Sequence, residues 1–157
     1  FVKGGIQPKR SMLFVLFASE EQGLNGSKHF VESWKNGYDK ITAMINLDCI
    51  GYGDSIQVGN GKSAPNLWKI ANEIDETSFN SMVDRTWSGG GADATPFFEK
   101  DIPCLYFVTT NSYDHLHLPS DKVETLNPTL YEKVVKLAHL TALEVANGNY
   151  EREEITK

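Results

Sequence analysis

The chain lacks several features that would place it outside the ordinary globular proteins. It has two cysteines in 157 residues, Cys49 and Cys104, which are too few for a disulfide framework. Both lie in or beside apolar runs, where a free cysteine behaves as a small hydrophobic residue. The longest apolar run near the start, residues 12–18, is too short to cross a bilayer, and no repeat or low-complexity stretch occurs. The sequence therefore predicts neither a disulfide-stapled scaffold nor a membrane segment in this chain.

Positive charge is also in short supply. The chain has 15 lysines and arginines against 21 aspartates and glutamates, for a net charge of −6. Nucleic-acid binding depends on clustered cations that release counterions from phosphates, so we expect no nucleic-acid partner. The acidic excess agrees with solubility, and also with an acidic pocket for a metal ion or an amino group.

What remains is typical of one soluble domain. The chain is 40% hydrophobic and long enough to bury a single core, so we expect one α/β domain over residues 1–157. The polar residues 150–157 are expected to form a disordered tail. The sequence opens on Phe1 without a methionine or a signal peptide, and we interpret it as a mature or cut piece whose N-terminal part is missing.

Strand-like and helix-like segments alternate along the chain. Buried strands are predicted over residues 12–18, 43–50 and 103–109, and a short strand over residues 55–58. Helices are predicted around residues 30–34, after Ser63 as N-cap with Pro65 in the first turn, at Thr95-Pro96, and from Asn127-Pro128 to Asn147-Gly148. This order predicts an α/β fold with a mixed, largely parallel sheet flanked by helices in three layers. In such sheets, sites lie beyond the carboxyl ends of the strands, here after Ala18, Leu47 and Val108.

Two acidic residues follow the first predicted strand. At a strand end, Glu20 and Glu21 can share a site, where one carboxylate binds a metal ion and the other accepts a proton from activated water. The alternative is a pair of acidic residues that starts a helix and is favoured by its dipole. Taken alone, the Glu20–Glu21 pair is better explained as the acidic start of a helix than as a metal site.

Other candidate ligands lie near the ends of later strands. Asp48 ends an apolar strand, where a carboxylate is costly unless it is hydrogen-bonded or coordinated; a turn cap is the alternative. His115 and His117 lie in a polar loop in which Asp121 is placed to orient a ring, although histidines in such loops are often only solvated. The chain contains no Gly-x-Ser-x-Gly elbow and no His-Glu-x-x-His helix, which excludes these two hydrolase motifs.

Taken together, these segments resemble the co-catalytic di-zinc exopeptidases typified by bacterial leucyl aminopeptidase and aminopeptidase Y. The resemblance is carried by Leu13-Phe-Val-Leu-Phe-Ala-Ser-Glu-Glu-Gln-Gly-Leu-Asn-Gly-Ser27, Ile45-Asn-Leu-Asp-Cys-Ile-Gly51, Gly91-Ala-Asp93 with Pro96-Phe97 and Ile102-Pro103, and His117-Leu-Pro-Ser-Asp121. The pieces occur in the order of the family over nearly the whole chain. Glu-Glu-x-Gly-x-x-Gly-Ser after an apolar strand is the most specific of them.

The resemblance implies a role for each matching residue. Glu20 would be the general base and acid, Glu21 and His117 would bind one zinc ion, and Asp48 would bind a second. Asp93 matches a supporting aspartate of the family. A complete site would contain two zinc ions and act on peptide substrates, and we interpret the whole protein as a secreted or periplasmic metallo-aminopeptidase.

The chain departs from the family pattern in three places. The other ligands of the family, a histidine and a metal-bridging aspartate, lie upstream of the Glu-Glu segment, and residues 1–19 contain neither residue type. Ala94 replaces a frequent histidine, and Leu116 replaces a tyrosine that helps to stabilise the oxyanion, so Tyr113 is a candidate substitute. We therefore expect this chain alone to be inactive. Two further hypotheses are a glutaminyl cyclase, which shares the fold and uses one zinc ion, and a non-catalytic peptidase-like binding module.

Overall fold

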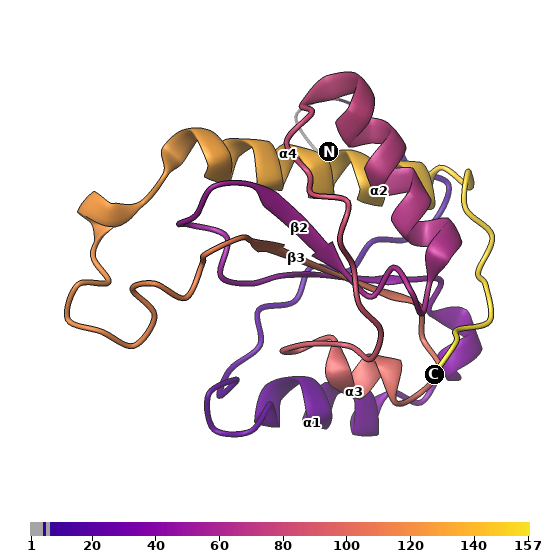
Figure 1. The fold of residues 1–157 in the computed structure, drawn as a ribbon. Helices are drawn as coiled ribbons and strands as arrows, with labels where there is room; N and C mark the ends of the chain where they lie inside the picture. Colours follow the sequence, from indigo (N-terminus) through magenta and orange to yellow (C-terminus); the bar gives the residue numbers. More distant parts are fainter. Residues whose placement is uncertain (1–4, 6) are drawn as a thin grey trace.

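A three-stranded mixed sheet lies at the centre of the molecule (Figure 1). The structure is a computed structural model that describes residue 5 and residues 7–157. Strands β1 (Met44–Leu47), β2 (Ile56–Gly59) and β3 (Cys104–Thr109) lie in the order β1-β3-β2. β1 pairs with β3 in parallel, and β2 pairs with β3 antiparallel. The predicted α/β class with a mixed sheet is confirmed, and in these described residues the two strand pairs divide equally between parallel and antiparallel.

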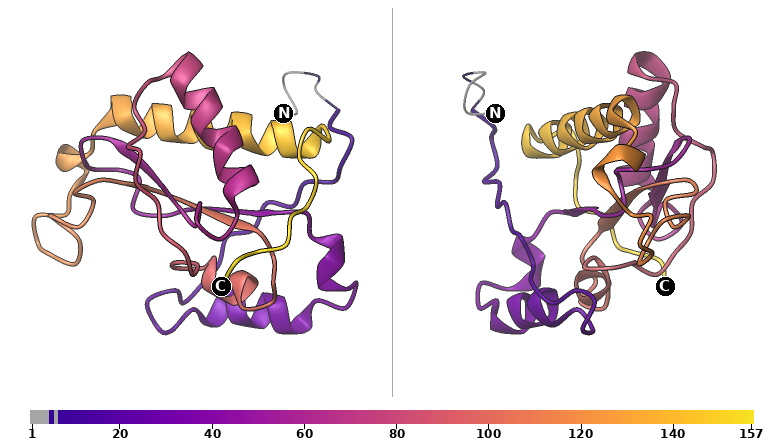
Figure 2. Two further views of the ribbon diagram at one scale, coloured as in Figure 1. Left: turned by 45° about the vertical axis from the view of Figure 1, so that its right-hand side comes forward. Right: turned by 90° about the vertical axis from the view of Figure 1, so that its left-hand side faces the viewer.

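Helices cover both faces of the sheet and give the predicted three layers. α2 (Pro65–Ser78) and α4 (Pro128–Ala146) lie on one face, and α1 (Asn25–Ser33) and α3 (Thr95–Phe98) lie on the other (Figures 1 and 2). The short 3₁₀ helices η2 (Tyr38–Lys40) and η3 (Val123–Thr125) lie in the connections. None of the helices in the described part of the chain is both long and apolar enough to cross a membrane.

The apolar runs of the sequence form two cores, one on each side of the sheet. All six residues of β3 are buried, because helices cover both of its faces. Ile56, Leu67, Phe107 and Leu137 belong to the core between the sheet and the α2–α4 layer. Val31, Phe97 and Ile102 belong to the smaller core beside α1 and α3.

The C-terminal residues hydrogen-bond to the first turn of α2. This arrangement differs from two predictions, the cap at Ser63 and the disordered tail. Ser63 does not cap this helix; its hydroxyl accepts a hydrogen bond from the Gly89 amide instead. The free amides of Asn66 and Leu67 in the first turn donate to the Glu153 carboxylate over 3.1 and 2.9 Å. The tail that we expected to be disordered therefore packs back along the domain, because its polar side chains satisfy backbone groups.

The other predicted helix cap is confirmed. The Asn127 side chain accepts a hydrogen bond from the Leu130 amide over 3.1 Å, and Pro128 follows as the first residue of α4. After the helix, Gly148 has a φ of 87°, which favours glycine. α4 therefore begins and ends where its local sequence signals predicted.

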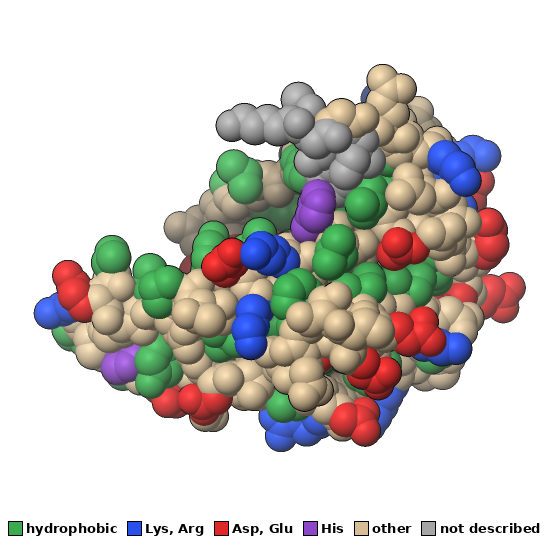
Figure 3. Space-filling model, turned by 90° about the horizontal axis from the view of Figure 1, so that it is seen from above, with side chains coloured by type: hydrophobic (Ala, Val, Ile, Leu, Met, Phe, Trp, Pro, Cys, Tyr) green, Lys and Arg blue, Asp and Glu red, His purple; other side chains and the backbone are tan. Residues whose placement is uncertain are grey.

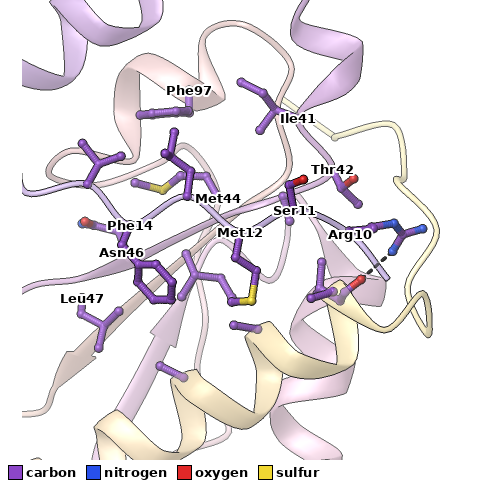
Figure 4. Close-up of a pocket in the computed structure, with 18 of the residues that line it drawn as sticks. Arg10, Ser11, Met12, Phe14, Ile41, Thr42, Met44, Asn46, Leu47 and Phe97 are labelled. Carbon is purple, nitrogen blue, oxygen red and sulfur yellow. Dashed lines mark hydrogen bonds between the residues drawn. The ribbon is translucent and has the colours of Figure 1, made fainter. Parts of the chain in front are cut away.

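The strand predicted over residues 12–18 is wrong. Residues 11–17 are extended but form no strand, and Leu13, Phe14 and Leu16 are exposed. Figure 2 shows this segment descending along one side of the molecule toward α1. An apolar run indicates a preference for burial, whereas a strand also needs a neighbouring backbone to pair with. In the described residues, a hollow separates residues 11–17 from β1, so this segment has no strand beside it on that side (Figures 3 and 4).

A buried carboxylate that the sequence analysis missed fixes the connection after α2. Asp75 is 3% exposed, and its oxygens accept hydrogen bonds from the amides of Ser81 and Met82. This connection in turn hydrogen-bonds to Ile56 of β2 through two backbone bonds of 2.8 Å. Asp75 therefore attaches α2 to the edge of the sheet.

We expect Asp75→Ala to lower the free energy of unfolding by about 2–3 kcal/mol, because it leaves two amides without their acceptor. Chemical denaturation of the variant measures this loss. Glu76→Ala, which changes an exposed carboxylate on the same helix, is the matched control and should stay within about 0.5 kcal/mol of the unsubstituted chain. Equal losses in the two variants would contradict the role given to Asp75.

Candidate functional site

Asp48 lies where β1 ends, beyond the carboxyl edge of the sheet. Its amide donates to the carbonyl of Phe107 over 3.2 Å, which continues the β1–β3 ladder by one residue. Its carboxylate accepts a hydrogen bond of 3.1 Å from the hydroxyl of Tyr106, a residue of β3. The carboxylate is therefore held by a neighbouring strand, as the cost of placing it beside an apolar strand requires.

Tyr106 connects Asp48 to the rest of the site and was not singled out from the sequence. Its pKa is raised, first by burial, then by the Asp48 charge and by a hydrogen bond with Tyr113. A Cβ atom on Gly91 would come within 2.7 Å of the Tyr106 ring, so glycine is needed there for close packing. Tyr113 is thus brought to the site through Tyr106, although its own side chain is largely exposed.

Glu20 and Glu21 lie in a tight turn between the extended segment and α1. The amides of Gly23 and Leu24 donate to the Glu20 carbonyl over 3.0 and 2.8 Å, and this turn leads directly into the helix. The Glu21 carboxylate lies 3.2 Å from Nε2 of His117, and both side chains are about two-thirds exposed. An ion pair this exposed adds little stability, so the contact matters mainly as a meeting of two ligand-type groups.

Glu20 lies within a concentration of negative charge. Its pKa is raised, first by partial burial and then by the charges of Asp48, Glu21 and Asp93, while His117 lowers it. Burial, and then the same charge of Asp48, raise the pKa of the Cys49 thiol to about 12. The structure therefore brings together four carboxylates and one imidazole from segments far apart in the sequence, in keeping with the predicted meeting of strand-end loops.

Asp93 is the most deeply buried carboxylate of this cluster. It is 9% exposed, and its Oδ1 atom has no hydrogen-bond partner within the described part of the chain. A buried carboxylate oxygen without a partner is costly. The sequence marked Asp93 as a supporting residue but gave no sign of this burial.

The loop that carries His117 is arranged differently from the expectation. Asp121 was expected to orient a histidine ring, yet in the described residues its carboxylate makes no hydrogen bond to His115 or His117. Nδ1 of His115 instead lies 2.9 Å from the Ser120 hydroxyl, and its ring packs edge-on against Tyr52. His117 has a φ of 59°, which turns the backbone at the residue that meets Glu21.

These residues supply the donor types that zinc prefers but do not form a closed zinc site. Imidazole nitrogen and carboxylate oxygen are common zinc ligands, and His117 and Glu21 lie side by side. Over the described residues, however, no three histidine, cysteine, aspartate or glutamate side chains are arranged to hold one metal ion. A catalytic zinc ion normally keeps about three protein ligands. The described residues thus fit part of a zinc site.

Comparison with known proteins identifies the family. The Peptidase family M28 profile matches residues 1–142, and the chain therefore belongs to this family. The chain is 27% identical over 149 residues to a probable leucine aminopeptidase of Arthroderma benhamiae, with 92% of this chain and 42% of that protein covered. It is 44% identical over 142 residues to a probable zinc metalloprotease of Phaeosphaeria nodorum, with coverage of 67% and 28%.

Solved structures agree with this assignment. The chain superposes on the Legionella pneumophila LapA aminopeptidase with a TM-score of 0.77 and 29% identity, covering 91% of this chain and 41% of that one. The resemblance to zinc exopeptidases seen in the sequence is thereby confirmed at the level of the family. The chain spans less than half the length of each of these relatives.

Proposed function

We propose that the whole protein is a zinc-dependent aminopeptidase, which removes N-terminal residues from peptides. The observation that carries this proposal is the convergence of Glu20, Asp48 and the Glu21–His117 pair at one edge of the sheet. In a member of Peptidase family M28, such a group of carboxylates and imidazole has the composition of a metal-dependent hydrolytic site. The names of the relatives, a leucine aminopeptidase and a zinc metalloprotease, support the same function.

Each residue has a proposed role, which the resemblance to the family implies. Glu21 and His117 would hold one zinc ion and Asp48 a second, and zinc would supply electrophilic activation of the scissile carbonyl. The Glu20 carboxylate, which is next to Glu21, accepts the proton of the attacking water and returns it to the departing amine. Tyr106 holds the Asp48 carboxylate in place through its hydroxyl. Asp93 and Tyr113 would be supporting residues. The Asp121 carboxylate makes no hydrogen bond to either histidine of its loop within the described residues, and we give it no role.

The test uses the whole protein with a leucyl peptide and an N-terminal glutaminyl peptide as alternative substrates. We expect release of leucine, loss of at least about 100-fold of this activity on zinc removal by a chelator, and recovery when zinc is added back. The measurement is product formation by mass spectrometry, with a heat-inactivated sample as blank. Cyclisation of the glutaminyl peptide without release of leucine would favour the cyclase hypothesis. A protein that binds no zinc and acts on neither peptide would favour the binding module.

A further inference from the structure

The chain contains four asparagine–glycine pairs, at residues 25–26, 36–37, 60–61 and 147–148. In such a pair, the backbone nitrogen of the glycine can attack the side-chain carbonyl carbon of the asparagine without help from an enzyme. Glycine has no Cβ atom, so its nitrogen is unshielded and its backbone turns freely toward the asparagine side chain. The attack requires a glycine amide that is not hydrogen-bonded and an asparagine side chain that can move.

Three of the four pairs are restrained by hydrogen bonds. In each of them the glycine amide is a donor: Gly26 to the Ala18 carbonyl over 3.0 Å, Gly61 to the Thr86 hydroxyl over 2.8 Å, and Gly148 to the Val145 carbonyl over 3.2 Å. Asn60 is also only 1% exposed, and its Oδ1 atom accepts a hydrogen bond of 2.9 Å from the Gly90 amide. At these three positions a hydrogen bond has to break before the glycine nitrogen can attack, which slows the reaction.

The pair Asn36–Gly37 is open by comparison. It lies in the connection between α1 and η2, at the periphery of the molecule (Figure 2). Asn36 is exposed, and within the described residues neither its side chain nor the Gly37 amide makes a hydrogen bond. Gly37 has a φ of 81°, and a Cβ atom there would collide with the Asp39 carboxylate, so this position needs glycine. The fold therefore keeps an unrestrained glycine amide beside an exposed asparagine.

We propose that Asn36 is a site of spontaneous deamidation. The Gly37 nitrogen forms a bond to Cγ of Asn36, and the side-chain nitrogen leaves as ammonia with the proton of the Gly37 amide. The product of this step is a cyclic imide. Water then opens the ring at either of its carbonyl carbons, which leaves aspartate or isoaspartate at this position. The reaction consumes only water and involves no oxidation or reduction.

The product adds a negative charge, and as isoaspartate it also lengthens the main chain. The main chain then passes through the former side chain, which inserts a methylene group just before Gly37. The Gly37 carbonyl accepts hydrogen bonds from Nε1 of Trp34 over 3.0 Å and from the Lys40 amide over 3.3 Å, and we expect the added length to loosen both. η2 leads through Ile41 into β1 at the end of the strand away from Asp48 (Figure 4), so the effect does not depend on the proposed hydrolysis.

Peptide mapping by mass spectrometry of the whole protein, aged in mildly alkaline buffer, tests the proposal. We expect Asn36 to be converted to the acid at least about fivefold faster than Asn25, Asn60 and Asn147, the equivalent of the one hydrogen bond that each of these pairs must break first. In denaturant, where the bonds are absent, the four asparagines should react at similar rates. An intact Asn36 in the folded protein, another pair that reacts as fast, or the same lead of Asn36 in denaturant would overturn the proposal.

Asn36→Gln is the matched variant, because its longer side chain forms the cyclic imide far more slowly at the same exposed position. Hydrogen–deuterium exchange compares fresh and aged samples of both proteins. In the unsubstituted protein, ageing should make the Lys40 amide exchange about fivefold faster, the equivalent of one hydrogen bond, and leave residues 134–145 of α4 unchanged. The aged Asn36→Gln protein should exchange like the fresh one. The same acceleration in both aged proteins would contradict deamidation at Asn36 as its cause.

Discussion

Replacement of Glu20 by glutamine is expected to lower kcat/KM of the whole protein for a leucyl peptide by about 10²–10⁴-fold, the usual contribution of a general base. Glutamine keeps the size of the side chain but cannot accept the proton of the attacking water. The Glu20 carbonyl accepts two amide bonds in the turn before α1, and the substitution leaves these backbone contacts in place. The measurement is steady-state hydrolysis at saturating zinc, together with zinc content by elemental analysis.

The zinc content distinguishes a base from a ligand. We expect the Glu20→Gln protein to retain as much zinc as the unsubstituted protein, because the proposed zinc ligands are Glu21, His117 and Asp48. Glu32→Gln, an equivalent change on the exposed side of α1, is the matched control and should leave the activity unchanged. Parallel losses of zinc and activity would make Glu20 a ligand and contradict its role as the base.

Elements whose signals are local could be predicted from the sequence. α4 begins at Asn127-Pro128 and β3 occupies a continuous apolar run, because a cap and a buried run are properties of a few adjacent residues. Residues 12–18 have the same kind of apolar run as β3, yet they form no strand in the described structure. The difference lies in the neighbours, which a single segment of sequence does not contain.

Contacts between distant residues escaped prediction for the same reason. The Glu153 carboxylate caps a helix that begins 88 positions earlier, at Pro65, and Asp75 binds amides beyond the end of its own helix. At the candidate site, the order of motifs drew attention to Glu20, Asp48 and His117. The hydrogen bond from Tyr106 to Asp48, by contrast, joins residues 58 positions apart and depends on the pairing of β1 with β3. Residue identity thus singled out the candidate donors, and the pairing of the strands decided which of these side chains meet.

The 157-residue chain without further polypeptide is expected to show no zinc-dependent hydrolysis of an aminoacyl anilide above the buffer blank. In the proposed site, the Glu21–His117 pair would supply two ligands where a catalytic zinc ion normally keeps about three, and Asp48 alone would be a weaker half-site. Two-metal hydrolysis requires metal ions about 3.5–4 Å apart. The resemblance places the carboxylate that would bridge them upstream of Glu20, and residues 1–19 contain no aspartate. The measurement is release of the coloured amine with excess zinc, and the whole protein serves as the positive control.

The outcome separates an incomplete site from an unfolded chain. Circular dichroism of the same sample should show the helices of the structure, so that inactivity is assigned to missing ligands rather than to loss of fold. The whole protein, assayed under the same conditions, should be active in the measurable range, while its Glu20→Gln variant should show no activity above the blank. Robust hydrolysis by the 157-residue chain alone would contradict the partial site, because it would mean that Glu21, His117 and Asp48 suffice to hold the zinc that the reaction needs.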